Sequence, residues 1–430
     1  MSASTFLSAN EAARELGISL PTLYSYVSRG LLRSESADEK SRARRYPQAD
    51  VQRLKERQQL RKDPGVAVES ALDWGMPVLD SALTLIEDGR CYYRGQDVFD
   101  LAKNQSVERV AALLWTGEMR DASFLFGDAV PSPRPTSLAL LGRLGLLRPV
   151  ERFATVLTVA ATEDPAAYDL RPTAVAQTGA RILEQMTVIA TGAGSVPDRN
   201  ASLPAGMLMP LGCSIAQALQ KAWIPDNLDS VRMFDAALIV SADHELNVSS
   251  FTVRCVASAG SNPYLAVVAG LAALQGAKHG GMCDRVEALL REVETPDRAR
   301  ETLAARLRRG DEIPGFGHRM YPMGDPRGKL LLQLAAEAAP GSAAVALSQA
   351  VAREAEEILG EAPVIDYGLV ALSTALVLPA GSALALFALG RAIGWIGHAI
   401  EQYRLDRMIR PRAQYTGELP SGIGKSEEKG

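Results

Sequence analysis

Hydrophobic positions near the start of the chain repeat with the spacing of two short helices. In the first segment, Ser8 can cap a helix whose apolar residues share one face. These residues are Ala12, Ala13 and Leu16. Residues 17–19 form a turn, and a second helix begins at Ser19 or Leu20 and ends near Gly30. The pattern therefore predicts a helix-turn-helix.

A polar loop and a charged third helix follow these two helices. The loop carries Arg42, Arg44 and Arg45. Asp50 can cap a helix over residues 51–62. A second helix that presents Thr22 and Tyr24 can enter a DNA major groove while the arginines contact phosphates. The segment is therefore either a DNA-binding domain, which we favour, or a small helical interaction module whose charges form a solvated face.

The remaining chain has mostly helical periodicity, as in residues 107–119 and 286–294, and strand-like alternation is rare. This predicts a nearly all-α body. Residues 369–390 form a run of 22 positions without a charge, long enough to cross a bilayer. Because Pro379 and Gly381 interrupt the run, we expect two buried helices joined by a short turn rather than a membrane span.

Charge is divided unevenly along the 430 residues. Residues 1–63 hold 12 Lys and Arg against 8 Asp and Glu, a net charge of +4, which leaves −8 for the rest of the chain. A basic segment favours polyanionic partners. The length predicts more than one domain.

The four cysteines are scattered and form no CxxC pair. The N-terminus lacks the basic start and apolar run of a signal peptide. Together these features predict reduced thiols and a cytoplasmic protein.

Three of the four histidines lie among small and polar residues: His244, His279 and His318. Asp366 adjoins the long apolar run, where burial raises a carboxyl pKa toward that of a useful base. Two histidines and such a carboxylate suit proton abstraction next to a carbonyl group, with a histidine hydrogen-bonded to the developing enolate. A metal hydrolase is the weaker hypothesis, because no short-spaced ligand pair occurs. No metal ion and no cofactor are predicted.

Three arginines can supply an anion site: Arg327, Arg391 and Arg410. Together they suit a dicarboxylate or tricarboxylate. Taken one at a time, each is better explained by structural ion pairing.

Read in order, the motifs resemble the citrate synthase family over about residues 66–418. They are CYYRGQDVFDLA at 91–102, His244, Asn247, His279, PGFGH at 314–318, Asp325-Pro326-Arg327, Asp366, Gly390-Arg391-Ala392 and RPRAQYTG at 410–417. The first 63 residues resemble the winged helix-turn-helix of the MerR and excisionase group, through Arg44, Tyr46, Asp50, Val51 and Leu54.

The resemblance implies a role for each matching residue. His279 polarises the thioester of acetyl-CoA, Asp366 removes the methyl proton, and His318 activates the ketone of oxaloacetate. The substrate carboxylates are held by His244, Asn247, Arg327, Arg391 and Arg410, the last from a partner subunit. The loop that contains PGFGH is expected to bind CoA. Its binding residues are Pro314, Gly315, Phe316, Gly317 and Arg319. Pro322 stands where many members have a basic residue, so Arg319 or Lys329 is expected to replace it.

The resemblance also implies the organisation of the chain: an all-α homodimer of the citrate synthase fold. A helix-turn-helix domain at 1–63 and a linker at 64–65 precede a large domain at 66–280 and 376–425, a small CoA-binding domain at 281–375 and a polar tail at 426–430. The expected partners are oxaloacetate, an acyl-CoA and DNA. The alternatives are a 2-methylcitrate synthase that uses propionyl-CoA and a transcription regulator that uses the body as a metabolite sensor.

Overall fold

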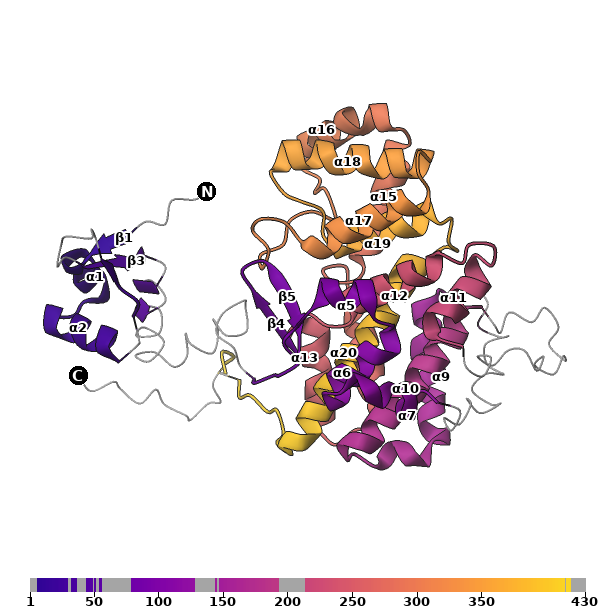
Figure 1. Ribbon diagram of the computed structural model, residues 1–430, viewed down its shortest axis with the longest axis horizontal. Coiled ribbons are helices and arrows are strands. Elements are labelled where there is room, and N and C mark those ends of the chain that lie inside the picture. The colour runs from indigo at the N-terminus through magenta and orange to yellow at the C-terminus, as the bar shows by residue number, and fades with distance from the viewer. Residues whose placement is uncertain are drawn as a thin grey trace. The chain divides into compact units, whose positions relative to one another are not determined.

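The computed structural model describes residues 6–29, 32–36, 44–48, 50–51, 54–55, 79–127, 144, 147–192, 213–413 and 415–418. The chain divides into two compact units, residues 1–80 and 81–430, called here the head and the body. Both are drawn in Figure 1.

The head contains the predicted helix-turn-helix. Helix α1 (Ala9–Leu16) is capped by Ser8, which forms a capping box with Glu11, and Gly17 ends it in a left-handed conformation. Helix α2 (Leu20–Ser28) is capped by Ser19, which accepts a hydrogen bond from the Thr22 amide. The Ser8 cap and the start of α2 at Leu20 agree with the sequence-based prediction.

A small antiparallel sheet supports the two helices of the head. Its order is β1-β3-β2, with β1 (Phe6–Ser8), β2 (Glu35–Ser36) and β3 (Arg44–Pro47). The buried core of the head consists of Ala12, Ala13, Leu16, Leu23, Leu32, Tyr46, Val51 and Leu54. Gln48 is already helical, so the third helix begins before Asp50. The Asp50 carboxylate instead receives two hydrogen bonds from Arg33, at 2.8 and 3.2 Å.

The body begins with a β-hairpin that the helical prediction did not include. Strands β4 (Thr84–Glu87) and β5 (Arg90–Tyr93) pair in an antiparallel manner, and β6 (Gln96–Asp97) pairs with β5. Asp88 and Gly89 both have positive φ, 51° and 74°, as a two-residue hairpin turn of this hand requires. The Asp-Gly pair was the available signal for this hairpin in the sequence.

Helices make up most of the rest of the body, as predicted. The first group comprises α5 (Val98–Asn104), α6 (Val107–Thr116), α7 (Ala122–Leu125), α9 (Pro149–Glu163), α10 (Pro172–Ala190), α11 (Ile215–Trp223), α12 (Ser230–Ser241), α13 (Val248–Ser258) and α14 (Pro263–Leu274). The second group comprises α15 (Met282–Val293), α16 (Ala299–Arg309), α17 (Pro326–Ala338), α18 (Ala343–Leu359), α19 (Ile365–Ala375) and α20 (Ser382–Leu405). Short 3₁₀ turns lie at Met119–Asp121, Pro165–Tyr168 and Pro296–Arg298.

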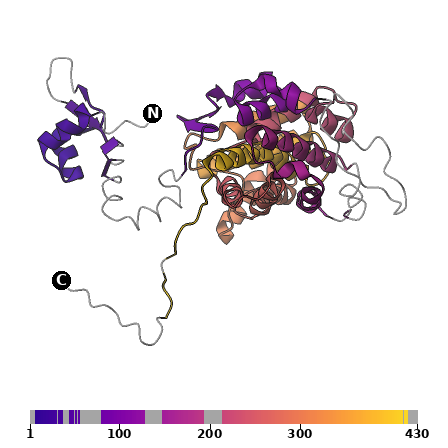
Figure 2. The same ribbon diagram turned by 90° about the horizontal axis from the view of Figure 1, so that it is seen from below.

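Helix α20 runs through the middle of the body. It packs against α10, α12, α13, α14 and α19, and Figures 1 and 2 show it in yellow among the other helices of the body. Among the described residues, α20 alone is long and apolar enough to cross a membrane, and its apolar stretch is fully buried by neighbouring helices. The uncharged run is therefore the predicted helix pair, α19 and α20, joined by a short turn.

Candidate active site

Two histidines and a tyrosine form one cluster between α12, α13 and the glycine-rich loop before α17. The rings of His244 and His318 meet edge to face, with centroids 5.0 Å apart. The Tyr321 hydroxyl lies 3.1 Å from His244 Nε2. Burial lowers the pKa of His244 well below its usual value, and the charges of Arg327 and Arg391 lower it further. His244 is therefore neutral and binds other groups by hydrogen bonding alone.

His318 has a defined hydrogen-bonding state. Burial, with the charge of Arg327, lowers its pKa to about 4, so the ring is neutral at physiological pH. The Met320 amide donates to His318 Nδ1 at 3.2 Å. Because Nδ1 accepts, the neutral ring carries its proton on Nε2, which becomes its hydrogen-bond donor.

Arg327 is held rigidly at the start of α17. Asp325 caps this helix and accepts two hydrogen bonds from the guanidinium, at 2.9 and 2.8 Å. Burial opposes the charge of Arg327, but Asp325 outweighs it and the pKa of Arg327 is raised. The guanidinium also lies over the Tyr321 ring, at 5.3 Å from its centroid. Arg327 is thus a permanent, fixed cation beside the histidine cluster.

Arg391 is a second buried cation, located in the middle of α20. Its Nε donates to the carbonyl oxygen of Ser241 at 2.8 Å, and its side chain is 2% exposed. Within the part of the chain that the structure describes, it forms no ion pair, and burial lowers its pKa. A buried guanidinium in this state is poised for an anionic ligand, because leaving it unpaired is unfavourable.

Glycines allow α12 to approach α20 closely enough for Arg391 to reach the carbonyl oxygen of Ser241. A Cβ atom at Gly390 would lie 2.6 Å from the carbonyl oxygen of Leu238, and one at Gly394 would lie 2.3 Å from that of Ala242. The Gly394 amide donates to the Ala242 oxygen at 2.9 Å. The Gly-Arg-Ala motif therefore places Arg391 directly against the end of α12.

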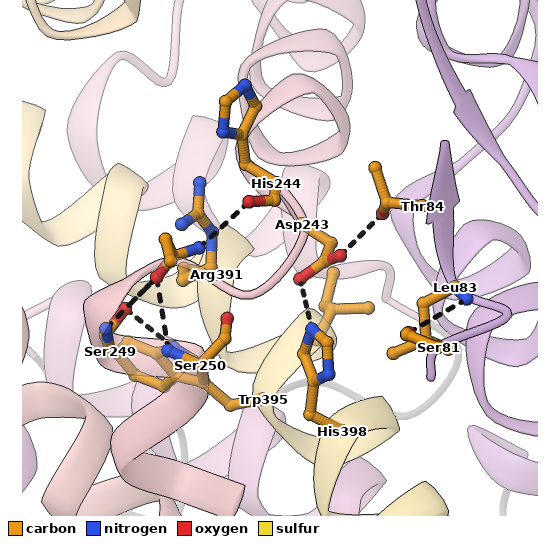
Figure 3. A network of polar contacts seen from close by, with 12 residues as sticks. Ser81, Leu83, Thr84, Asp243, His244, Ser249, Ser250, Arg391, Trp395 and His398 are labelled. Atoms are coloured by element: carbon orange, nitrogen blue, oxygen red, sulfur yellow. Dashed lines mark hydrogen bonds and ion pairs between the residues drawn. The ribbon is translucent and has the colours of Figure 1, made fainter. Parts of the chain in front are cut away.

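A buried polar network stabilises the segment that carries His244 (Figure 3). The Asp243 carboxylate accepts a hydrogen bond from Thr84 of β4 at 2.5 Å and lies 3.2 Å from His398 Nε2. Burial would raise the pKa of Asp243, but the neighbouring His398 and Arg391 hold it below its usual value. Asp243, Thr84 and His398 were not among the site residues predicted from the sequence.

His279 is oriented from the start of α13. Its Nε2 lies 2.9 Å from Ser249 Oγ, which also receives a hydrogen bond from Trp395 Nε1 at 3.1 Å. Asn247 caps α13 and accepts from the Ser249 hydroxyl at 2.7 Å. Burial, with a contribution from Arg391, lowers the pKa of His279 to about 4. Asn247 therefore positions Ser249, which in turn holds the Nε2 edge of the His279 ring. The ring itself is neutral.

Asp366 lies in the first turn of α19 and is 8% exposed. Burial raises its pKa to about 6, in the direction expected from its apolar surroundings. The thiol of Cys283 donates to Asp366 Oδ1 at 3.4 Å. The side chain thus combines burial with a pKa that leaves it ionised, yet basic, near neutral pH.

The PGFGH loop is fixed against the segment that leads into α19. Gly317 N donates to the Ala362 oxygen at 3.1 Å, and Val364 N donates to the Gly315 oxygen at 2.9 Å. Both glycines have positive φ. A Cβ atom at Gly317 would lie 2.4 Å from the Glu361 carboxylate. The loop borders a cavity of about 520 Å³ lined by Phe316, Gly317, His318, Arg319, Tyr321, Pro322, Met323, Gly324, Glu356, Gly360, Glu361 and Ala362.

The structure brings most of the predicted site residues together. Six of them are close enough to affect one another's pKa values electrostatically. They are His244, His279, His318, Arg327, Arg391 and Asp366. Arg410 is exposed in the segment after α20, and Arg319 is exposed at the cavity. Among the described residues, no group of three His, Cys, Asp or Glu side chains is arranged to hold a metal ion.

The proposed DNA-contacting residues have different environments. Tyr24 is 51% exposed on α2, and Thr22 hydrogen-bonds to Ser19 in the cap. Arg44 donates to Ser34, whereas Arg45 pairs with Glu35 and lies over the Phe6 ring, 4.2 Å from its centroid. Arg42 lies outside the described residues.

Residues 71–412 match the family model described as "Citrate synthase, C-terminal domain", which covers well over half of the chain. The chain belongs to the citrate synthase family. Residues 6–59 match a model described as "Helix-turn-helix domain", so this family member carries a helix-turn-helix domain at its N-terminus. These matches confirm the resemblance to citrate synthases and the helix-turn-helix at the N-terminus, while membership of the MerR and excisionase group stays a prediction.

Relatives of two activities have similar identity to this chain. The citrate synthase of Haloferax volcanii is 31% identical over 371 residues, which cover 80% of this chain and 94% of that protein. The 2-methylcitrate synthase of Mycobacterium tuberculosis is 31% identical over 336 residues, which cover 76% of this chain and 84% of that protein. The fold is that of Thermoplasma acidophilum citrate synthase, solved as a ternary complex with carboxymethyl coenzyme A and oxaloacetate. That chain is 23% identical with a TM-score of 0.72, over 82% of this chain and 97% of the other.

Proposed function

We propose that the body condenses acetyl-CoA with oxaloacetate to give citrate and CoA. The observation that carries this proposal is the combination of a buried carboxylate with a pKa of about 6, two neutral histidines and two buried arginines. The arginines suit the two carboxylates of oxaloacetate. The carboxylate and the histidines suit enolate chemistry on a thioester.

The first step in this proposal is proton abstraction. Ionised Asp366 takes a proton from the methyl group of acetyl-CoA, and the electron pair of the C–H bond moves toward the thioester oxygen. In this step the Ser249 hydroxyl turns from Asn247 and donates to His279 Nε2, so the neutral ring carries its proton on Nδ1. The Nδ1–H then donates a hydrogen bond to the thioester oxygen and stabilises the enolate as it forms. Ser249 and Trp395 keep the His279 ring in position, because they fix its other edge.

The second step forms the new carbon–carbon bond. The enolate carbon attacks the ketone carbon of oxaloacetate, and the Nε2–H of His318 stabilises the developing alkoxide. The alkoxide gains a proton to become the hydroxyl of citryl-CoA, and loss of the methyl proton from Asp366 balances this gain and restores the ionised base. Arg327, Arg391 and His244 hold the oxaloacetate carboxylates throughout. Water then hydrolyses the resulting citryl-CoA to citrate and CoA. The cavity beside the PGFGH loop is proposed to hold CoA, with Arg319 near its phosphates and Phe316 along its wall.

The direct test is thiol release by the purified protein, measured with acetyl-CoA and with propionyl-CoA, each in the presence and absence of oxaloacetate. We expect release that depends on oxaloacetate and is faster with acetyl-CoA. Faster release with propionyl-CoA would identify a 2-methylcitrate synthase, which the Mycobacterium tuberculosis relative supports as the second candidate. One methylene group changes binding by only about 1–3 kcal/mol, so the two substrates must be compared directly. No release with either substrate would favour the metabolite-sensor alternative.

For the head, we propose that it binds DNA. Its support is the exposed Tyr24 in the middle of α2, the wing strands β2 and β3, and the +4 charge of residues 1–63. A gel-shift titration should show binding that weakens as salt rises, because phosphate contacts release counterions. Tyr24→Ala should weaken it, and Tyr168→Ala, at an exposed tyrosine in the body, serves as the control.

We also propose that the enzyme is a cytoplasmic homodimer whose large and small domains close over the substrates. Helix α14 is apolar around its whole circumference, yet Leu265 is 39% exposed and Ala272 is also exposed. On the neighbouring α13, Val248 is 59% exposed. A second copy covering this face would remove the exposed apolar surface, and Arg410 is then proposed to reach the partner's substrate. Sedimentation at several concentrations tests the dimer.

A further inference from the structure

A buried thiol contacts the carboxylate that we propose as the catalytic base. Cys283 Sγ lies 3.4 Å from Asp366 Oδ1, and the cysteine is fully buried. The two residues lie in the first turns of α15 and α19, which pack against each other. No step of the proposed reaction uses this thiol.

The direction of the hydrogen bond follows from the chemistry of the two groups. Burial and the adjacent Asp366 raise the pKa of the Cys283 thiol well above its usual value, so it keeps its proton. An ionised carboxylate can only accept hydrogen bonds. The thiol is therefore the donor, and it favours the ionised form of Asp366, in opposition to the effect of burial.

Cys283 is also joined to His279 by a short, hydrogen-bonded turn. Met282 N donates to the His279 oxygen at 3.0 Å, and Cys283 N donates to the Gly280 oxygen at 3.2 Å. A Cβ atom at Gly280 would lie 2.7 Å from the Leu274 carbonyl oxygen, so the turn is packed tightly against the end of α14. One rigid segment thus carries His279 at one end and a contact to Asp366 at the other.

We propose that Cys283 is a positioning residue whose thiol orients the Asp366 carboxylate and couples it to the turn that carries His279. This inference rests on the proposed function, in which Asp366 and His279 act on the same acyl group. A merely structural cysteine would fill space in the core, and its replacement would change stability without changing the ionisation of Asp366. The two roles therefore make different predictions.

The test compares Cys283→Ala, which removes the donor, with Cys283→Ser, which keeps one. Cys213→Ala, at a half-buried cysteine before α11, is the matched control. We expect Cys283→Ala to lower kcat by about tenfold with little change in the KM for oxaloacetate. The acid limb of its kcat/KM profile should move to higher pH, because a donor to the ionised carboxylate is lost. Cys283→Ser should restore both values toward wild type, and Cys213→Ala should leave them unchanged.

A second readout does not depend on turnover. Carbon-13 NMR of protein labelled at aspartate carboxyls, with Asp366 assigned through Asp366→Asn, gives the pKa of Asp366 directly. We expect a higher pKa in Cys283→Ala than in wild type. An unchanged pKa and acid limb in folded Cys283→Ala would overturn the positioning role while leaving the proposed function intact. A wild-type protein inactive with both acyl-CoAs would instead overturn the proposed function, and the NMR titration would still decide whether the thiol acts on Asp366.

Discussion

The site has two halves that use burial in opposite ways. In the half that we propose binds carboxylates, Arg327 and Arg391 remain charged although they are almost fully buried. Arg327 pairs with Asp325, whereas Arg391 donates to the Ser241 carbonyl oxygen and is favoured by the charge of Asp243. In the half that we propose transfers protons, burial makes His279 neutral and raises the pKa of Asp366 toward that of a useful base. The difference shows that the partners of a buried group decide what burial does to it. A group with polar or charged partners keeps its charge, whereas a group without them has its pKa shifted toward the neutral form.

Asp366→Asn provides the largest expected effect and tests the proton-transfer half alone. Removing the base should reduce turnover by about 10²- to 10⁴-fold. Oxaloacetate binding, measured by calorimetry, should be nearly unchanged, because the arginines are intact. Asp226→Asn, at an exposed carboxylate, is the control. Full activity in Asp366→Asn would mean that another residue is the base.

Arg391→Gln tests the carboxylate-binding half alone. We expect the KM for oxaloacetate to rise about 100-fold, which corresponds to about 2–3 kcal/mol for a lost charge-assisted contact in a buried site. The KM for the acyl-CoA should change much less. Arg404→Gln, at an exposed position on the same helix, is the matched control. Equal effects of both variants on oxaloacetate would argue against a direct contact with Arg391.

The pH dependence distinguishes the halves without mutation. Asp366 must be ionised to accept a proton, so kcat/KM should fall about tenfold per pH unit below its pKa of about 6. His279 and His318, with pKa values of about 4, stay neutral over the same range. Oxaloacetate affinity measured between pH 5 and 7 should therefore change little. A parallel loss of affinity would show that the two halves titrate together.

Thr84→Val gives the smallest expected effect and probes the network behind the carboxylate-binding half. The change removes the 2.5 Å hydrogen bond from Thr84 to Asp243 and leaves a buried acceptor with one partner fewer. We expect a loss of about 1–2 kcal/mol in the free energy of unfolding, measured by denaturant titration, with a small rise in the KM for oxaloacetate. Thr158→Val, at an exposed position on α9, should cost less. An unchanged stability would show that the hydrogen bond contributes nothing net.

Local signals accounted for much of the fold. Ser8 was recognised as a cap, and the start of α2 was placed at Ser19 or Leu20, because a capping side chain accepts a hydrogen bond from an amide only three residues away. The uncharged run was recognised as two helices because Pro379 and Gly381 interrupt it. The hairpin at Asp88-Gly89 carries an equally local signal and could have been predicted from it.

By itself, the sequence determined the helical class, the helix-turn-helix head and the short contexts around the histidines, Asp366 and the arginines. Tertiary structure alone decided which side chains meet: Cys283 contacts Asp366 across 83 residues, and Tyr321 contacts His244 across 77. It also decided that Asp243, Thr84 and His398 form one buried network. The physical reason is that caps and turns depend on neighbours in the chain. Contacts between helices, and the burial that shifts a pKa, depend on how distant segments pack.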